Sequence, residues 1–166
     1  MVYLMNKKED KPMKILVAAK ENDIKRIWVE LQKARLGNSV CIVRSGYEAL
    51  DFLFQFGKFN TSKPEKPDLI LLSTELADIR AADFIKYIKL GHEFCKIPII
   101  LLGSSCKEML SGRIDFKGCI HYLPKPFNYR AFFRTLGKLG DEWSISEELP
   151  VCFFRNRNRG KQTWKG

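Results

Sequence analysis

The chain has 166 residues, of which 45% are hydrophobic and 29% are charged, a composition typical of one globular domain with short flanking segments. Its longest apolar runs, residues 69–72 and 97–102, fall far short of the roughly 20 residues that cross a bilayer, which excludes a membrane span. The first dozen residues lack the apolar stretch and cleavage pattern of a secretory leader, so we expect a cytoplasmic protein.

The formal net charge is +10, from 29 basic and 19 acidic side chains. Such an excess favours an acidic partner, a nucleic acid or an anionic surface. Half of the net charge lies in the last 12 residues, which contain five basic side chains and no acid. The five cysteines are widely spaced, without a CxxC motif or a Cys/His pair at zinc-ligand spacing. We therefore expect reduced thiols, no metal site and no cofactor.

Between residues 14 and 140, short apolar runs alternate with longer helical patterns. This rhythm is typical of a parallel sheet with crossover helices. Each run is nearly continuous, as in strands that are covered on both faces. The five predicted strands are residues 15–18, 40–43, 69–72, 99–102 and 119–123.

Five helices are predicted in the same stretch. Asn22 and Asp23 are candidate caps of the first helix, and Ser45 opens the second. Residues 59–67 form a polar loop, because the two prolines in it cannot continue a helix. The remaining helices are predicted at residues 82–90, 107–113 and 127–139.

The two ends of the chain fall outside this pattern. Residues 1–13 form an N-terminal extension, residues 14–140 the domain, and residues 141–166 a C-terminal extension. The basic tail from residue 155 onward has few side chains that could build a core, so we expect it to be disordered.

Several stretches resemble the receiver domains of two-component response regulators. KILVAAKENDIKRIWVEL (14–31) is similar to their first strand and helix, and IHYLPKPF (120–127) to the end of their fifth strand. RSGYEALDFLFQFGKF (44–59), followed by PDLILLSTEL (67–76), is similar to their second helix and third strand. The resemblance implies a doubly wound, flavodoxin-like α/β fold whose five-stranded parallel sheet has the order 2-1-3-4-5. The long polar connection is most similar to that of stand-alone receivers that partner bacterial phytochromes.

The resemblance also implies where the phosphorylation site lies. In receivers an acidic pair after the first strand and an aspartate after the third hold magnesium, and that aspartate accepts the phosphoryl group. Here these positions fall on Ala19, Lys20 and Ser73, and the hydroxyl residue of the fourth strand falls on Gly103. A methyl, an ammonium and a hydroxyl cannot replace three carboxylates around a magnesium ion. The site is expected to be degenerate.

Two other positions of the family pattern are retained. Lys125 matches the lysine that points at the phosphorylated aspartate, and Tyr122 matches the switch aromatic. We expect Lys20 and Lys125 to face one cleft without neutralising acids, at a repulsion of roughly 2–4 kcal/mol for a dielectric constant near 20. Either Lys20 then turns to solvent, or Glu21 or an anion fills the gap.

Other titratable residues receive no chemical role. Glu75 and Asp78 follow the third strand and are interpreted as solvated loop acids rather than as metal ligands. His92 and His121 lie on different elements, away from any Cys or Asp at metal-ligand spacing.

These observations predict a pseudo-receiver and not an enzyme. It would act as a protein-interaction module in signal transduction, without magnesium or phosphorylation. In receivers the fourth helix, fifth strand and fifth helix form the usual output surface, although another face remains an alternative here. On this surface a basic rim around an aromatic suits an acidic protein partner. Its predicted partner-binding residues are Met109, Arg113, Tyr122, Arg130 and Arg134.

The alternative is a nucleic-acid-binding regulator whose basic tail contacts phosphates and stacks an aromatic on a base. The chain has no helix-turn-helix, RNA-recognition or zinc-finger pattern, so such binding would be mainly electrostatic. The candidate residues are Arg155, Arg157, Arg159, Lys161 and Trp164. A third hypothesis makes Ser73 the substrate of a serine kinase.

Overall fold

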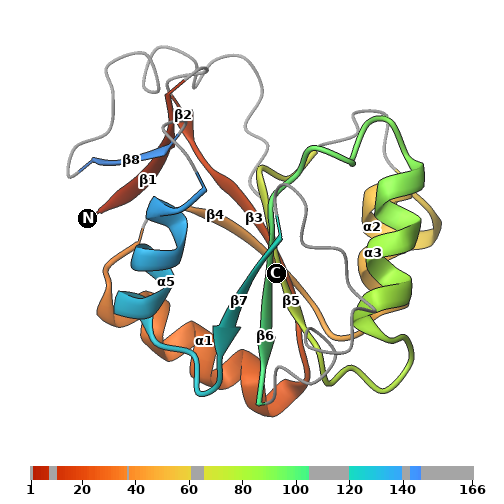
Figure 1. Cartoon of the computed structure of the whole chain (residues 1–166), viewed down its shortest axis with the longest axis horizontal. Helices are drawn as coiled ribbons and strands as arrows, with labels where there is room; N and C mark the ends of the chain where they lie inside the picture. The colour runs from red at the N-terminus through yellow and green to blue at the C-terminus, as the bar shows by residue number, and fades with distance from the viewer. Residues whose placement is uncertain are drawn as a thin grey trace.

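The structure is a computed structural model that describes residues 2–7, 11–36, 38–60, 66–104, 120–139 and 143–146. Its main sheet has five parallel strands in the spatial order β4-β3-β5-β6-β7, as Figure 1 shows. This is the order 2-1-3-4-5, and the predicted doubly wound fold is confirmed. The strands are β3 (Lys14–Ala18), β4 (Ser39–Val43), β5 (Leu69–Ser73), β6 (Ile99–Gly103) and β7 (Ile120–Pro124).

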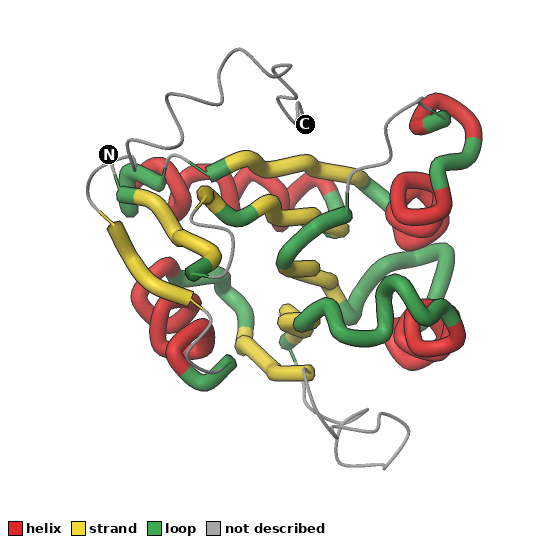
Figure 2. Tube along the Cα trace, turned by 90° about the horizontal axis from the view of Figure 1, so that it is seen from above, coloured by secondary structure: helices red, strands yellow, loops and turns green. Residues whose placement is uncertain are grey.

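Helices cover both faces of this sheet. Helices α1 (Glu21–Lys33) and α5 (Tyr129–Gly137) lie on one face, and α2 (Gly46–Phe54) and α3 (Ala81–Leu90) lie on the other (Figures 1 and 2). One short turn, η1 (Gly57–Phe59), follows α2. The helix predicted at residues 107–113 lies outside the described residues. Within the described part of the chain, no helix is long and apolar enough to cross a membrane.

The central strands are apolar because both of their faces are buried. All five residues of β5 and of β6 are buried. Successive side chains of a strand point to opposite faces, so Leu69 and Leu71 pack toward α1 and α5. Ile70 and Leu72 pack toward α2 and α3. The sheet thus separates two apolar cores, as its doubly wound topology requires.

The two predicted helix starts have different outcomes. Ser45 is the N-cap of α2, where its Oγ accepts a hydrogen bond from the backbone N–H of Glu48 at 3.0 Å. The prediction that Asn22 and Asp23 cap the first helix is wrong. Lys20 takes the N-cap position of α1 without a side-chain hydrogen bond, and the carboxylate of Asp23 is used elsewhere, as described below.

A second, smaller sheet joins the two flanking segments. Strand β1 (Tyr3–Asn6) pairs antiparallel with β2 (Lys11–Pro12) on one side and with β8 (Trp143–Ser146) on the other. Leu4 of β1 is buried in the core beside α1 and α5. Asn38 fixes it there, since its side chain donates to the Leu4 carbonyl and accepts from the Leu4 N–H. The N-terminal segment therefore packs on the domain rather than projecting from it.

Candidate functional site

The candidate site lies at the carboxyl end of the main sheet, the edge at which open α/β sheets form their sites. Ser73 ends β5 and Gly103 ends β6, and both residues are buried. Ala19 follows β3 and is also buried, whereas Lys20 is exposed at the start of α1. Three of the predicted positions are thus at this edge, and the Lys20 side chain turns to solvent.

Lys125 follows β7 and has a side chain that is only 12% exposed. Its Nζ donates to Asp23 Oδ2 at 2.7 Å and to Glu75 Oε2 at 2.9 Å. Both are charge-assisted hydrogen bonds, which are among the stronger ones in proteins. The expectation that Lys125 has no neutralising acid is therefore wrong. Helix α1 supplies one carboxylate, and the loop after β5 supplies the other.

The pKa values of both residues of the Lys125–Glu75 pair are shifted. Burial disfavours the charged form of Lys125, but its hydrogen bonds to Asp23 and Glu75 outweigh burial and raise the pKa of Lys125. Hydrogen bonds from Ser104 and Lys125 lower the pKa of Glu75 from 4.5 to about 2. The backbone N–H of Ser104 donates to Glu75 Oε1 at 3.2 Å. At neutral pH the pair is therefore fully ionised.

Asp78 also has a defined role in the fold. Its two carboxylate oxygens accept hydrogen bonds from the backbone N–H groups of Gly46 at 3.1 Å and Tyr47 at 2.9 Å, in the first turn of α2. Burial acts to raise the pKa of Asp78, but these hydrogen bonds prevail and lower it. Glu75 and Asp78 are loop acids, as interpreted, and remain at least partly exposed, but both also make defined contacts, because one binds Lys125 and the other caps α2.

Ser73 and Tyr122 each make a hydrogen bond to the backbone at this edge. Ser73 Oγ accepts a hydrogen bond from the backbone N–H of Glu75 at 3.2 Å. The Tyr122 hydroxyl donates to the carbonyl of Gly103 at 2.7 Å. A Cβ at Gly103 would overlap Oγ1 of Thr74, so the neighbouring threonine occupies the space that a larger residue would need. The Ser73 hydroxyl thus supports the loop that carries Glu75, and the Tyr122 hydroxyl supports the end of β6.

The two carboxylates that converge in this cleft are already paired with a cation. Among the described residues, no three His, Cys, Asp or Glu side chains come together as a metal site. The two carboxylates that do converge, on Asp23 and Glu75, have the ammonium of Lys125 between them. Magnesium requires near-octahedral oxygen ligands at about 2.0–2.1 Å. The cleft holds its own cation instead.

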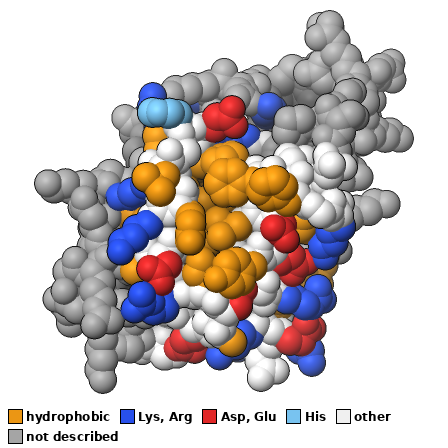
Figure 3. All heavy atoms as spheres, turned by 90° about the vertical axis from the view of Figure 1, so that its right-hand side faces the viewer, with side chains coloured by type: hydrophobic (Ala, Val, Ile, Leu, Met, Phe, Trp, Pro, Cys, Tyr) orange, Lys and Arg blue, Asp and Glu red, His pale blue; other side chains and the backbone are white. Residues whose placement is uncertain are grey.

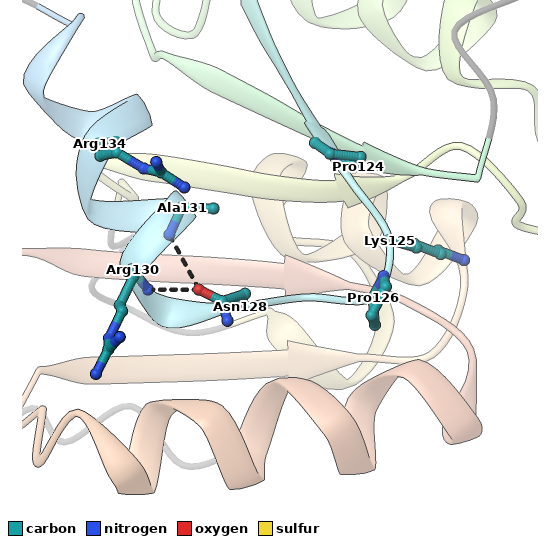
Figure 4. A pocket seen from close by; sticks show the side chains of 7 residues that line it. All are labelled: Pro124, Lys125, Pro126, Asn128, Arg130, Ala131 and Arg134. Atoms are coloured by element: carbon teal, nitrogen blue, oxygen red, sulfur yellow. Dashed lines mark hydrogen bonds between the residues drawn. The ribbon is translucent and has the colours of Figure 1, made fainter.

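A pocket of about 690 Å³ lies beside this cleft, between the end of β7 and α5 (Figure 4). Asn128 begins α5 by accepting hydrogen bonds from the N–H groups of Arg130 at 2.9 Å and Ala131 at 3.2 Å. Arg134 lies one turn further along the same helix. The pocket is lined by Pro124, Lys125, Pro126, Asn128, Arg130, Ala131 and Arg134. Its described lining contains two arginines and no acid.

The structure brings together only part of the predicted partner-binding set. Arg130 and Arg134 line one pocket, while Tyr122 directs its hydroxyl toward Gly103. Met109 and Arg113 lie outside the described residues. So do the candidate nucleic-acid residues Arg155, Arg157, Arg159, Lys161 and Trp164.

Sequence reasoning did not find Asp23 and Glu75 as partners of Lys125. Asp23 has the residue type and position of a helix cap, and Glu75 stands in a loop, so local pattern favours other roles for both. One signal was available, because a lysine at the end of a buried strand needs a counter-charge. The strand order places the loops after β3 and β5 at the same edge.

No family profile matches the chain. The polar-differentiation response regulator DivK of Brucella ovis is 31% identical to it over 99 residues, which are 59% of this chain and 73% of that protein. The solved structure of the bacteriophytochrome response regulator RtBRR matches with a TM-score of 0.73 and 26% identity, over 89% of each chain. That of AtBRR matches with a TM-score of 0.73 and 27% identity, over 82% of this chain and 98% of the other. The five-stranded fold and these relatives agree, and the chain belongs to the receiver-domain response regulators of two-component signal transduction.

Proposed function

We propose that this protein is a pseudo-receiver, a regulatory protein-interaction module whose conformation does not depend on phosphorylation. Receiver domains are regulatory rather than catalytic, and family members receive their signal as a phosphoryl group. The observation that carries the proposal is the pairing of Lys125 with two carboxylates of its own chain, Asp23 and Glu75. The family resemblance assigns this lysine to the phosphorylated aspartate. Glu75 therefore supplies a permanent anion where other receivers acquire one.

The chemistry of the acceptor position supports the same conclusion. Phosphotransfer from histidine requires a carboxylate that can form an acyl phosphate, and Ser73 offers a buried hydroxyl. Catalysis of phosphoryl transfer depends on a metal ion that neutralises charge on the transferred group. Neither Ala19 nor Lys20 has a side-chain oxygen to ligate such an ion. The protein therefore lacks both the acceptor and the means to activate the donor.

We place partner binding at the pocket that contains Arg130 and Arg134. Its lining combines two arginines of α5 with the apolar side chains of Pro124 and Pro126, and the described lining residues include no acid. Arginine forks bind carboxylates in bidentate geometry, and arginine is enriched at the centres of interfaces. An acidic segment of a protein partner therefore fits this surface best.

The test of the proposal is phosphorylation of the full chain by acetyl phosphate in the presence of magnesium. We expect its intact mass to stay unchanged, while a receiver with an intact acceptor aspartate gains one phosphoryl group in the same reaction. A hydroxylamine-labile adduct on this chain would contradict the proposal. Adding a phosphorylated histidine kinase in place of acetyl phosphate should give the same negative result.

A further inference from the structure

The surface of α2 and α3 that faces away from the sheet is unusually apolar. Figure 3 shows hydrophobic side chains gathered on this face, with basic and acidic side chains around them. The members are Tyr47, Phe54, Phe56, Tyr87 and Leu90, each between 39% and 80% exposed, and we name them the α2–α3 patch. The site described above does not use any of them.

The patch is one continuous surface rather than a set of scattered residues. The rings of Phe54 and Phe56 have centroids 6.4 Å apart, and Phe54 also packs edge-on against Phe94, which follows α3. Tyr47 of α2 lines the same pocket as Tyr87 and Leu90 of α3. The two helices thus present their aromatic side chains side by side.

The size of the patch suggests an interface. An aromatic side chain has roughly 150–250 Å² to bury, so four that are about half exposed leave roughly 300–500 Å² of aromatic surface in water. The largest patch on a typical monomer is about 300–600 Å², and it is often functional. A standard interface takes roughly 800 Å² from each partner, so Leu90 and the polar border would supply the rest.

The charged side chains beside the patch favour a second copy of the chain as the partner. Asp51 lies on the outward side of α2, between Tyr47 and Phe54, and Lys86 lies on the outward side of α3, one turn before Leu90. Both are exposed, and neither has an ionic partner among the described residues. A negative charge thus stands on one helix and a positive charge on the other, near the middle of each. A partner with the same arrangement, turned by a two-fold axis, would pair both.

We propose that the protein forms a two-fold symmetric homodimer through the α2–α3 patch, with α2 of each protomer on α3 of its partner. A two-fold axis that runs between the two helices and parallel to them places each α2 over the partner's α3. In such an isologous interface every contact occurs twice. Asp51 of one copy then meets Lys86 of the other at two equivalent contacts, one on each side of the axis.

Sedimentation equilibrium of the full chain tests the dimer directly. Interfaces of this size span micromolar to picomolar affinity, and we expect a monomer–dimer equilibrium with a Kd of about 10 μM or tighter. Leu90→Glu places a charge within the α2–α3 patch and should weaken dimerisation at least about tenfold. The matched control Val29→Glu changes an equally apolar exposed residue on α1 and should leave the Kd unchanged. A chain that stays monomeric at about 200 μM, or a Leu90→Glu variant that dimerises normally, would overturn the proposal.

A charge swap tests the orientation of the two copies. Asp51→Lys alone sets lysine against lysine, and Lys86→Asp alone sets aspartate against aspartate, so each variant should dimerise at least about fivefold more weakly. Mixing the two variants restores opposite charges at both contacts and should give a heterodimer with near wild-type affinity. Failure of the mixed variants to associate better than either one alone would contradict the pairing of α2 with the partner's α3.

Discussion

The ion pairs of the largely buried Lys125 link three segments at the carboxyl end of the main sheet, namely α1, the loop after β5 and the residues after β7. Its ammonium has lost most of its hydration, and among the described residues the carboxylates of Asp23 and Glu75 offset that loss. Removing either carboxylate leaves a buried charge with one partner. The other lysine of the site, Lys20, contributes nothing here because its side chain is in water.

The contribution of Glu75 should depend on pH. Glu75→Gln should lower the free energy of unfolding at neutral pH by about 1 kcal/mol, because a carboxylate that is 37% exposed is partly screened by water. A lowered pKa stabilises the folded state above the unfolded-state value, and that stability is lost as pH falls through the folded-state value. The difference between the two proteins should therefore be constant down to pH 4.5 and shrink from there toward pH 2.

Urea unfolding at several pH values measures this difference. Glu21→Gln is the matched control, since Glu21 pairs with Arg44 at 2.8 Å while both side chains are more than half exposed. Its effect should stay below about 0.5 kcal/mol at every pH. A Glu75→Gln effect that persisted unchanged at pH 3 would show that the carboxylate charge is not what stabilises the loop.

At the scale of elements, the start of α2 depends on the loop after β5. Ser45 caps the helix from its own end, and Asp78 binds two further N–H groups of the first turn from across the sheet edge. The side chain of Ile79, the residue after Asp78, lies close to Gly46. The segment that carries Glu75 therefore also positions α2, and with it half of the α2–α3 patch.

The close approach at Gly46 predicts a sensitive helix position. Gly46→Ala should lower the free energy of unfolding by about 1–3 kcal/mol, because the added Cβ would overlap Cγ2 of Ile79, which is β-branched and stiff. Gly137→Ala, at the end of α5, is the matched control, since a Cβ there has nothing within 4 Å. It should stabilise the protein by about 0.5 kcal/mol. Thermal or urea unfolding compares the two, and equal effects would rule out the steric explanation.

At the scale of the whole molecule, the partner surface can be tested by charge reversal. The combined change Arg130→Glu and Arg134→Glu should weaken binding of a peptide rich in Asp and Glu at least about fivefold, measured by fluorescence anisotropy. Arg80→Glu is the control, since Arg80 lies at the start of α3 and pairs with Asp83.

Removal of residues 155–166 separates this proposal from nucleic-acid binding. The truncated chain should bind the acidic peptide as the full chain does. If the tail instead binds DNA or RNA, affinity should fall with salt at a slope near −0.7 to −0.9 for each phosphate contact, and truncation should flatten that slope. Loss of peptide binding on truncation would instead indicate that the acidic partner binds the tail.

The fold could be predicted from sequence because its signals are local. The strands read as continuous apolar runs since the sheet is covered on both faces, and Ser45 is recognisable as a cap without knowledge of the rest of the chain. The ion pairs of Lys125 could not be predicted in this way, because its partners lie 102 and 50 residues away. Strand β8 could not be predicted either, because its four residues form a strand only by pairing with the distant β1.

The small sheet has a consequence for the order in which the molecule is completed. Strand β1 is made before its partner β8, which follows after about 135 residues of chain. At roughly 5–20 residues per second this means a wait of roughly 7–27 s on the ribosome. The five strands of the main sheet and four helices that cover it are all synthesised within that interval. Leu4 can already find its place in the core beside α1, while the open edge of β1 stays unpaired until almost the last described residue has emerged. Strand β1 thus precedes the main sheet in the chain, yet its pairing is completed after that sheet has been made.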